Sequence, residues 1–432
     1  MVYFPCAFGS WLGLTEMKIA VIGTGISGLV AAKILAEDHE VTVFEADERI
    51  GGHTHTVDVD LEGQTFSIDT GFIVYNETTY PHFCELLDEL HVKTQKSDMS
   101  FSLSCEQTGL EWGSIGLGGV FAQRRNLARP RFLKMLLDVL RFNREAPSLV
   151  ESLDASVELG DLLIEKGYSD TFTRHYIIPM GAAIWSARPS RFLKFSAKSF
   201  IRFFMNHGLL ASSGRLEWRV LQGGSRAYLE PLTQTYADRI FCGGRVERVS
   251  RRSDAVEVRV EGHDSFDFDR VVLAVHSDQA LAMLANPTKS EIEVLSNILY
   301  RSNDVLLHTD ASVMPKNRRA WASWNYRTAE VDQEDVFVSY HMNRLQGIES
   351  EHSFFVTLNG RPYIDPESIL GEFEYHHPIF DADAVKAQER HGEIDGADRI
   401  HYCGAYWGWG FHEDGVRSAK IMADRILGKA LS

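Results

Sequence analysis

The sequence predicts an α/β fold whose central sheet is parallel and takes strands from both ends of the chain. Residues 18–22 form a short β-branched strand, a glycine turn follows at once, and a helical pattern covers residues 29–36. A second apolar strand is expected at 40–44. Near the other end, residues 399–405 predict a strand that runs into another glycine turn and a helix. The strand–helix–strand order favours a parallel, Rossmann-type sheet.

The first turn, Gly23-Thr-Gly25-Ile26-Ser27-Gly28, has the glycine spacing of a dinucleotide-binding motif. Gly23 permits the tight turn, Gly25 lets a pyrophosphate approach the backbone, and Gly28 lets the helix lie close to the strand. The helix start offers its partial positive charge to the phosphates. Glu45, with Ala46 after it, ends the second strand where a ribose hydroxyl is expected. Together these features predict a bound dinucleotide.

Bulk composition limits the class of protein. With 432 residues, the chain is long enough for two structural domains that share an interface. Acidic residues outnumber basic ones by 60 to 44, and the net charge of -16 disfavours nucleic acid as a partner. No apolar run reaches the roughly 20 residues of a membrane-spanning helix. The scattered cysteines suggest neither disulfides nor a metal site, and they favour a reducing, cytoplasmic location.

A second glycine pair follows the nucleotide motif. Arg49-Ile-Gly51-Gly52-His53 and the later Asp69-Thr70-Gly71 resemble stretches of the superfamily that contains flavin monoamine oxidase, protoporphyrinogen oxidase and phytoene desaturase. The resemblance implies FAD, bound non-covalently, with Arg49 on a phosphate and the glycines beside pyrophosphate and flavin. His53 stands where arginine is more frequent. It is therefore either the second phosphate contact or an ordinary loop histidine.

The C-terminal segment resembles the last FAD-binding segment of the same superfamily. A strand ends at Gly404, and Asp414-Gly415-Val416 begins a helix. The resemblance places the strand end on the ribityl chain and aims the helix start at the flavin O2 edge. There the helix dipole would stabilise the negative charge of a reduced flavin. Val246, at the start of an alternating apolar stretch that runs to residue 260, resembles a valine that touches adenine in these proteins.

These motifs divide the chain into interleaved segments. Residues 1–16 are apolar but lack lysine and arginine, so they do not fit a secretory signal, and we interpret them as an extension before Met17. The FAD-binding domain is predicted, with a glutathione-reductase-like fold, at residues 17–77, 215–280 and 393–432. The α+β substrate domain is predicted at residues 78–214 and 281–392.

A basic amphipathic helix is expected in the first substrate segment. Leucines repeat at helical spacing between residues 133 and 140. The basic residues around them are Arg124, Arg125, Arg129, Arg131, Lys134, Arg141 and Arg144. Such a helix fits peripheral contact with anionic lipid at the inner face of the membrane, or docking of an acidic carrier. The alternative is a helix packed on the core with a solvated basic face.

Aromatic and histidine residues beside the turns are the candidates for substrate chemistry. His207 or His412 is predicted as the catalytic base, because a neutral histidine titrates in the needed range. Tyr406 flanks the expected flavin segment and is also predicted to be catalytic. The predicted substrate-pocket residues are Met180, Trp185, Asn206, Trp324 and Trp407.

Five further stretches resemble a bacterial amine-oxidase-like subgroup of the superfamily. They are residues 77–81, 97–101, 206–210, 223–226 and 403–408. The subgroup is associated with methyltransferases similar to cyclopropane fatty acid synthase, which implies a modified acyl chain as substrate. The expected reaction is oxidation or desaturation of a methylated fatty acyl chain, towards a furan fatty acid. Oxygen or a quinone is the expected electron acceptor.

Three rival functions share the fold. A flavin-dependent isomerase or mutase would use FAD without net oxidation. Amine oxidases of the superfamily carry a lysine near the flavin, and residues 300–306 contain none. A non-catalytic lipid-binding protein on this fold would lack flavin, and the intact glycine turns argue against that reading.

Overall fold

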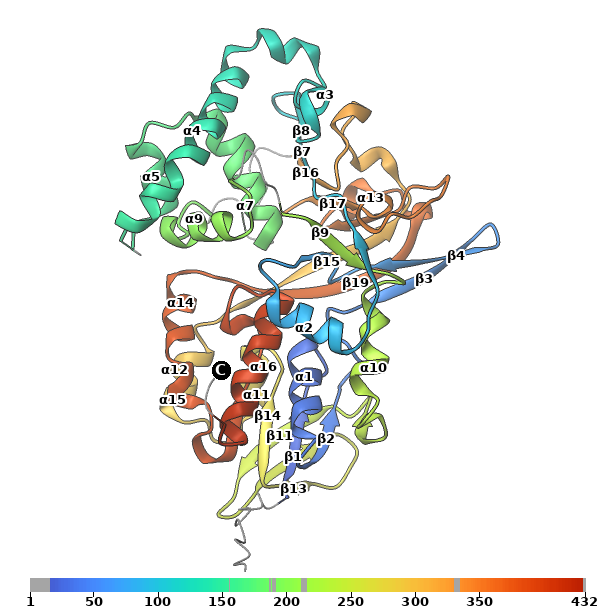
Figure 1. Ribbon diagram of the computed structural model, residues 1–432, viewed down its shortest axis with the longest axis vertical. Coiled ribbons are helices and arrows are strands. Elements are labelled where there is room, and N and C mark those ends of the chain that lie inside the picture. The colour runs from blue at the N-terminus through green and yellow to red at the C-terminus, as the bar shows by residue number, and fades with distance from the viewer. Residues whose placement is uncertain are drawn as a thin grey trace, which may run out of the picture.

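The computed structural model describes residues 16–154, 156–185, 188, 192–210, 216–329 and 335–429. All but Glu16 of the predicted N-terminal extension lies outside these residues. Figure 1 shows two lobes, one above the other, with the long strands β15 (Tyr300–His308) and β19 (Ile369–Pro378) crossing between them. The chain passes between the lobes several times, so neither lobe is a continuous segment.

A five-stranded sheet forms the centre of the lower lobe. Its order is β10–β2–β1–β14–β20, and every neighbouring pair is parallel. The strands are Ile240–Phe241, Glu40–Phe44, Lys18–Ile22, Arg270–Leu273 and Ile400–Tyr402 in that order. Helices cover the sheet, which explains why its strands are almost continuously apolar. This sheet confirms the predicted α/β fold.

Two helices from opposite ends of the chain pack beside this sheet. They are α1 (Ile26–Leu35) and α16 (His412–Ile426). Gly415 of α16 packs against α1, where a Cβ would come within 2.7 Å of Cγ2 of Ile26. In the first turn of α16, the buried Glu413 carboxylate accepts hydrogen bonds from the N–H groups of His82 and Phe83, at 3.3 and 3.0 Å. It thereby caps the start of α2 (Pro81–Glu89).

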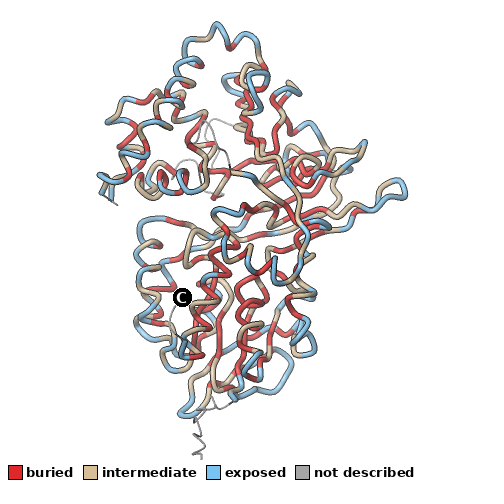
Figure 2. Tube along the Cα trace, in the orientation of Figure 1, coloured by how far each residue is buried: buried red, intermediate tan, exposed pale blue. Residues whose placement is uncertain are grey.

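The upper lobe contains a seven-stranded sheet in the order β19–β15–β18–β17–β16–β7–β8. The strands not yet bounded are β18 (Phe355–Leu358), β17 (Val338–His341), β16 (Trp324–Thr328), β7 (Phe101–Cys105) and β8 (Leu110–Gly113). All pairs are antiparallel except β16 with β7. One buried core joins this sheet to the helices α4 (Pro130–Ser152) and α7 (Ile178–Trp185). In Figure 2, buried residues are gathered in the interior of the upper lobe, and exposed residues lie along its outer edge.

The remaining elements are short. The strands are β3 (Thr56–Leu61), β4 (Gln64–Asp69), β5 (Tyr75–Asn76), β6 (Thr94–Lys96), β9 (Trp218–Leu221), β11 (Val246–Arg251), β12 (Val256–Val260) and β13 (Phe266–Phe268). The helices are α3 (Gly116–Val120), α5 (Leu159–Glu165), α6 (Asp170–Phe172), α9 (Ala197–Asn206), α10 (Leu229–Thr233), α11 (Ser277–Met283), α12 (Lys289–Leu295), α13 (Met342–Gln346), α14 (Ala382–Glu389) and α15 (His391–Ile394). A π-helical turn, η2 (Thr173–Ile177), links α6 to α7.

The apolar stretch from Val246 to Val260 is not one strand. It folds as the antiparallel pair β11 and β12, in which Val249 lies opposite Val258. The exposed Ser253 and Asp254 interrupt the alternation between them, and both residue types favour turns.

The core packing refines the predicted domain limits. Helices α12 and α14 lie in the predicted substrate segment 281–392, yet they belong to the lower lobe (Figure 1). Their residues Leu295 and Ala387 share one buried core with Val271 and Ile400 of the parallel sheet. We therefore propose that the second substrate segment runs from about β15 to β19, and that both helices belong to the FAD-binding domain.

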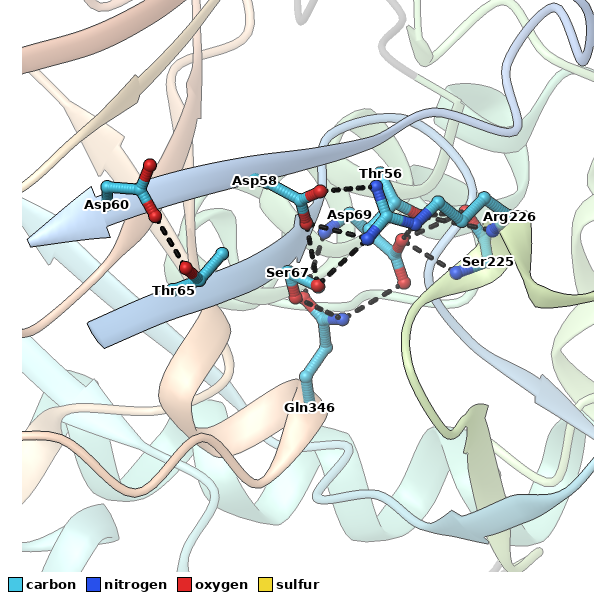
Figure 3. A network of polar contacts seen from close by, with 9 residues as sticks. All are labelled: Thr56, Asp58, Asp60, Thr65, Ser67, Asp69, Ser225, Arg226 and Gln346. Atoms are coloured by element: carbon cyan, nitrogen blue, oxygen red, sulfur yellow. Dashed lines mark hydrogen bonds and ion pairs between the residues drawn. The ribbon is translucent and has the colours of Figure 1, made fainter. Parts of the chain in front are cut away.

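A buried carboxylate joins distant segments at the boundary of the two lobes (Figure 3). Asp69, at the end of β4, accepts hydrogen bonds from the Thr56 hydroxyl at 2.6 Å and from the Ser225 N–H at 2.7 Å. It also accepts from the Ser225 hydroxyl at 2.9 Å and from the Gln346 amide at 3.1 Å. Burial raises the pKa of Asp69 to about 6, against the effect of its hydrogen-bond donors and the nearby Arg226.

We expect Asp69→Ala to lower the free energy of unfolding by about 3 kcal/mol, because it leaves several buried donors without an acceptor. Urea denaturation measures this loss. Asp58→Ala is the matched control, since Asp58 pairs with Arg226 in the same network but is 44% exposed. It should cost less than about 1 kcal/mol. Equal losses of unfolding free energy in the two variants would show that Asp69 contributes no more to stability than Asp58.

Candidate functional site

A cavity of about 1970 Å³ lies where the two lobes meet. The carboxyl ends of β1, β2 and β14 line one part of it, and residues of α4, α7 and β16 line another. Ligands of open parallel sheets bind outside the carboxyl ends of the strands. The cavity therefore contains the position at which a dinucleotide is expected.

The three glycines of the first turn have different surroundings. A Cβ on Gly23 would lie 2.7 Å from the Ala274 oxygen, and one on Gly28 would lie 2.0 Å from the Gly23 oxygen. Both positions therefore require glycine to keep the turn and the helix in place. A Cβ on Gly25 would meet no protein atom within 4 Å, although Gly25 lines the cavity. This open space at the start of α1 fits a pyrophosphate.

Glu45 lies at the end of β2 and lines the cavity together with Ala46. Its carboxylate accepts a hydrogen bond from the Thr24 N–H at 3.0 Å and another from the Asp47 N–H at 3.0 Å. The Thr24 hydroxyl also contacts this carboxylate. These bonds fix its orientation, and Oε1, which accepts only from Asp47, keeps capacity for a ribose hydroxyl. Val246 lines the same end of the cavity.

The second glycine pair packs directly on the first turn. The Gly51 N–H donates to the Thr24 oxygen at 3.1 Å, and a Cβ on Gly52 would lie 3.1 Å from Cα of Gly25. Gly52 has a φ of +58°, in the left-handed region that favours glycine. The pair thus extends the wall of the pyrophosphate space, as the resemblance implies.

His53 is half-buried in this wall and lines the cavity, so it is not an ordinary surface histidine. Thr70 and Gly71 also line the cavity, and a Cβ on Gly71 would lie 2.2 Å from the His53 oxygen. Arg49 does not line the cavity. Its guanidinium lies 3.5 Å from the Thr54 oxygen and close to the His53 ring, where its charge helps to lower the pKa of His53.

Three further histidines lie around His53, and none of them is among the site residues predicted from the sequence. They are His276, after β14, and the adjacent pair His376 and His377 in β19. The ring of His377 lies 5.4 Å from that of His53, and the ring of His276 lies 5.9 Å from that of His376. All four line the cavity.

Burial and mutual repulsion keep most of this cluster neutral. Burial, with the charges of Arg49 and His376, lowers the pKa of His53 to about 4. Burial and the neighbouring histidines lower the pKa of His276 and of His377 to about 3. The Asn303 amide donates to Nδ1 of His377 at 3.0 Å, which leaves the proton on Nε2. Near neutral pH the cluster thus offers uncharged donors and acceptors.

The C-terminal segment brings Gly404, Tyr406 and His412 to the cavity. His412 is the first residue of α16, and its Nε2 contacts the hydroxyls of Thr54 at 3.1 Å and Tyr228 at 3.3 Å. Its ring stacks on Phe72 at 3.5 Å. Burial lowers its pKa to about 3. These contacts occupy Nε2, so His412 is placed to shape the wall more than to accept a proton.

His207, which follows α9, and Met180 of α7 also line the cavity. The Nδ1 of His207 lies 3.0 Å from the Phe203 oxygen, which fixes its proton on Nδ1 and leaves Nε2 as an acceptor. Its ring lies 5.4 Å from that of Phe411, the residue before α16. Trp324 also lines the cavity, and its buried indole N–H has no hydrogen-bond partner within the described chain.

Other predicted site residues do not line the cavity. Trp185 packs among aromatic rings behind the wall, with Phe203 at 4.4 Å, and Trp407 stacks on His391 at 4.0 Å. Asn206 is exposed at the end of α9. The Asp414 carboxylate accepts from the N–H groups just before α16, and Gly415 and Val416 lie inside the core. Trp185, Asn206 and Trp407 are thus outside the ligand space. The backbone contacts expected from Asp414, Gly415 and Val416 to the flavin stay a prediction.

The missed histidines had only a weak signal in the sequence. His376 and His377 stand side by side in a polar strand, and His276 follows a buried strand at the position where cavity residues of parallel sheets occur. Nothing in the sequence indicated that β19 would cross to the end of β14. That contact depends on the pairing of β19 with β15, in which His377 lies opposite Arg301.

We expect Gly25→Val to abolish most FAD binding while it leaves the fold intact. The Cβ of the added side chain would lie in the open space at the start of α1, with no protein atom within 4 Å. The ratio of flavin to protein absorbance should fall at least about tenfold. The free energy of unfolding of the apoprotein, measured in urea, should change by less than about 1 kcal/mol. Gly28→Ala is the contrasting control, because its methyl group would strike the Gly23 oxygen and destabilise the apoprotein itself. Normal flavin content in Gly25→Val would refute this placement of the pyrophosphate.

We expect the free energy of unfolding to fall as pH drops from about 6.5 to 4. In this window the unfolded chain protonates histidines that the fold keeps neutral, because their pKa is lowered to about 4 for His53 and about 3 for His276 and His377. His276→Phe removes one such group, so stability should fall less steeply with acid. His263→Asn, at an exposed turn, should keep the full slope. Urea titrations across this pH range measure how the free energy of unfolding depends on pH. An unchanged slope in His276→Phe would contradict a neutral histidine cluster.

Comparison with known proteins agrees with this geometry. A family model described as flavin containing amine oxidoreductase matches residues 26–320. A 4,4'-diapophytoene desaturase of Staphylococcus aureus is 28% identical over 185 residues, which cover 37% of this chain and 35% of the relative. A probable flavin-containing monooxygenase of Arabidopsis thaliana is 34% identical over 93 residues, or 20% of this chain and 17% of the relative. The chain thus covers about a third or less of the length of these relatives.

Solved structures match along nearly the whole chain. Cyclohexylamine oxidase from Brevibacterium oxydans superposes with a TM-score of 0.68 at 15% identity, covering 95% of this chain and 100% of that one. A fatty acid isomerase from P. acnes that produces CLA gives a TM-score of 0.68 at 16% identity, with 96% and 98% covered. At these identities the match shows the fold. With the family model covering most of the sequence, the chain belongs to the flavin-containing amine oxidoreductases and is an FAD-dependent oxidoreductase.

Proposed function

We propose that this oxidoreductase oxidises or desaturates a hydrophobic acyl substrate, a methylated fatty acyl chain, towards a furan fatty acid. The observation that carries the proposal is an apolar arm of the cavity. Met135, Leu136 and Val139 of α4 line this arm, and Tyr176, Met180 and Ile184 line it from η2 and α7. The total volume of 1970 Å³ exceeds the roughly 300–1000 Å³ of most ligand sites. A long apolar ligand therefore has room beside the cofactor.

The charges of the lining support an acyl chain over an amine. Among the described lining residues, the acidic side chains lie at the nucleotide end or form ion pairs. Those at the nucleotide end are Glu45, Asp47, Glu247 and Glu261. Asp98 pairs with Arg344 at 2.6 Å, and Glu217 pairs with Lys96 at 2.5 Å. A cationic amine in the apolar arm would thus lack a free counter-charge.

Similar proteins support this substrate class in two ways. The 4,4'-diapophytoene desaturase, which is 28% identical over its matched part, is named as a desaturase, the kind of reaction proposed for this chain. The CLA-producing fatty acid isomerase shares the fold, so this fold accommodates a fatty acyl chain.

The residues of the chain have distinct parts in such a reaction. Bound FAD supplies the acceptor for two electrons, transferred as hydride. His207 is the proposed base, because its Nε2 is an acceptor and burial, which lowers its pKa to about 4, keeps the ring neutral. The unpartnered indole N–H of Trp324 offers a hydrogen bond to a polar group of the substrate. The aromatic wall excludes water from the reacting carbon.

Electrons leave to oxygen or a quinone in this proposal, and the enzyme works in the cytoplasm. Amine oxidation is the less favoured alternative. Among the described lining residues, Lys96 is the single lysine, and it is 75% exposed and paired with Glu217. Flavin-dependent isomerisation remains the second alternative, because it needs the same cavity.

Met180→Lys tests the apolar arm. We expect anaerobic reduction of the flavin by a methylated unsaturated fatty acyl substrate to slow at least about tenfold, because the variant places a charge beside the chain. The flavin content should stay normal. Met205→Lys is the matched control, since Met205 is 38% exposed on α9 and does not line the cavity. Its rate should equal that of the unaltered protein.

The same assay separates the alternatives. Bleaching of the flavin by simple amines but not by acyl substrates would favour amine oxidation. Product formation with no consumption of oxygen or quinone would favour an isomerase. A purified protein without a flavin absorption band would overturn the whole proposal.

A further inference from the structure

One outer face of the upper lobe combines exposed leucines with arginines. Of the twelve large hydrophobic side chains that are exposed in the described residues, six lie between residues 115 and 140. They are Ile115, Leu117, Leu127, Leu133, Leu137 and Leu140. Figure 1 shows the segments that carry them, α3 and the N-terminal part of α4, at the far end of the molecule from the parallel sheet. We call this surface, with residues 316–319 beside it, the apical face.

Helix α4 explains how these side chains come to the surface. Phe132, Met135 and Phe142 occupy one side of the helix and are buried in the core. Leu133, Leu137 and Leu140, spaced four and three residues apart, occupy another side and are 37%, 63% and 61% exposed. The helix is therefore apolar on two sides, and core packing uses only one of them.

The apical face is strongly basic in an acidic protein. Residues 111–145 contain seven basic residues and three acidic ones. Glu111 and Asp138 are buried, and Glu145 pairs with Arg141 and Arg144. Asp138 pairs with Lys134. Arg125 and Arg129 bond only to neutral oxygens in the described chain, and Arg124 and Arg131 are exposed. The exposed Lys316, Arg318 and Arg319 add positive charge from the segment η6 (Arg318–Ala320), which contacts α3.

The cavity reaches this same face. Leu140 is 61% exposed and also lines the cavity, and so do Ile115 and Gly116 at the start of α3. Leu136 and Val139 follow on the inner side of α4. A continuous apolar path therefore runs from exposed leucines into the apolar arm.

We propose that the apical face binds the surface of an anionic lipid bilayer and that the cavity opens onto it. Leucines insert among the acyl chains, while the arginines contact lipid phosphates. The net charge of the whole chain is -16, so attraction to an anionic surface must come from this local cluster. The described helices include none that is both long enough and apolar enough to span a bilayer.

This inference deepens the proposed function, since an acyl substrate would enter directly from the bilayer. Binding to vesicles can nevertheless be measured without turnover. Failure of the acyl assay and failure of membrane binding are therefore separate results.

Vesicle flotation tests the surface with vesicles of phosphatidylcholine alone or with added phosphatidylglycerol. We expect the protein to float with the anionic vesicles only, and higher salt to weaken this binding. Leu137→Glu should reduce binding at least about tenfold, and Arg124→Glu with Arg131→Glu should reduce it by about fivefold for each residue. Ile292→Glu, at a 46% exposed position on α12, controls for the first variant. Lys289→Glu with Lys386→Glu gives the same change in net charge away from the face and controls for the second.

Three outcomes would overturn the inference. One is absence of binding to anionic vesicles, including the case in which an acidic acyl carrier protein binds instead. Another is equal loss of binding in the control variants. The last is unaltered binding of Leu137→Glu when its flavin content and urea midpoint show that it folds.

A second readout links the face to the cavity. Leu137 does not line the cavity, so flavin reduction by a detergent-dispersed acyl substrate should be the same in Leu137→Glu and the unaltered protein. Reduction by substrate embedded in anionic vesicles should be slower in the variant. Equal rates from vesicles would show that substrate reaches the cavity by another route.

Discussion

The buried carboxylate of Asp69 is the constraint on which the site depends. It ties the end of β4 to the turn at Gly224–Ser225 and to Gln346 of α13, three segments that are far apart in the chain. Thr70 and Gly71 follow it directly, and Gly71 leaves no room for a Cβ against the His53 oxygen. Hydrogen bonds from Thr56, Ser225 and Gln346 to Asp69 thus connect the segment that follows His53 with two distant parts of the chain.

The cavity has two ends of opposite character because two lobes build it. At the nucleotide end, backbone N–H groups and fixed carboxylates come from the ends of parallel strands, where helix starts also converge. At the other end, helices α4 and α7 contribute apolar side chains that the upper sheet holds in place. Between them lies a set of neutral histidines. Their low pKa follows from burial, so the region where a flavin ring is expected carries little net charge.

Surface and cavity share one helix. The same turns of α4 bury Met135 in the core, present Leu137 to solvent, and line the cavity with Leu136 and Leu140. The arginines of this region lie in η1 (Arg124–Ala128), which contains Arg124 and Arg125, and along α4, which contains Arg131, Arg141 and Arg144. The apical face and the apolar arm are thus consequences of one packing arrangement.

The sequence by itself determined the parallel sheet, the glycine turns and Glu45, because these features are local and each residue's role follows from its neighbours in the chain. The limits of β1 and β2 agree with those expected at 18–22 and 40–44. Only the tertiary structure decided which aromatic and histidine residues meet in the cavity. In the folded chain the ring of His276 lies beside that of His376, and Trp185 and Asn206 do not line the cavity. The stretch that begins at Val246 forms two strands. Such contacts depend on the pairing and crossing of distant strands, which no local pattern specifies.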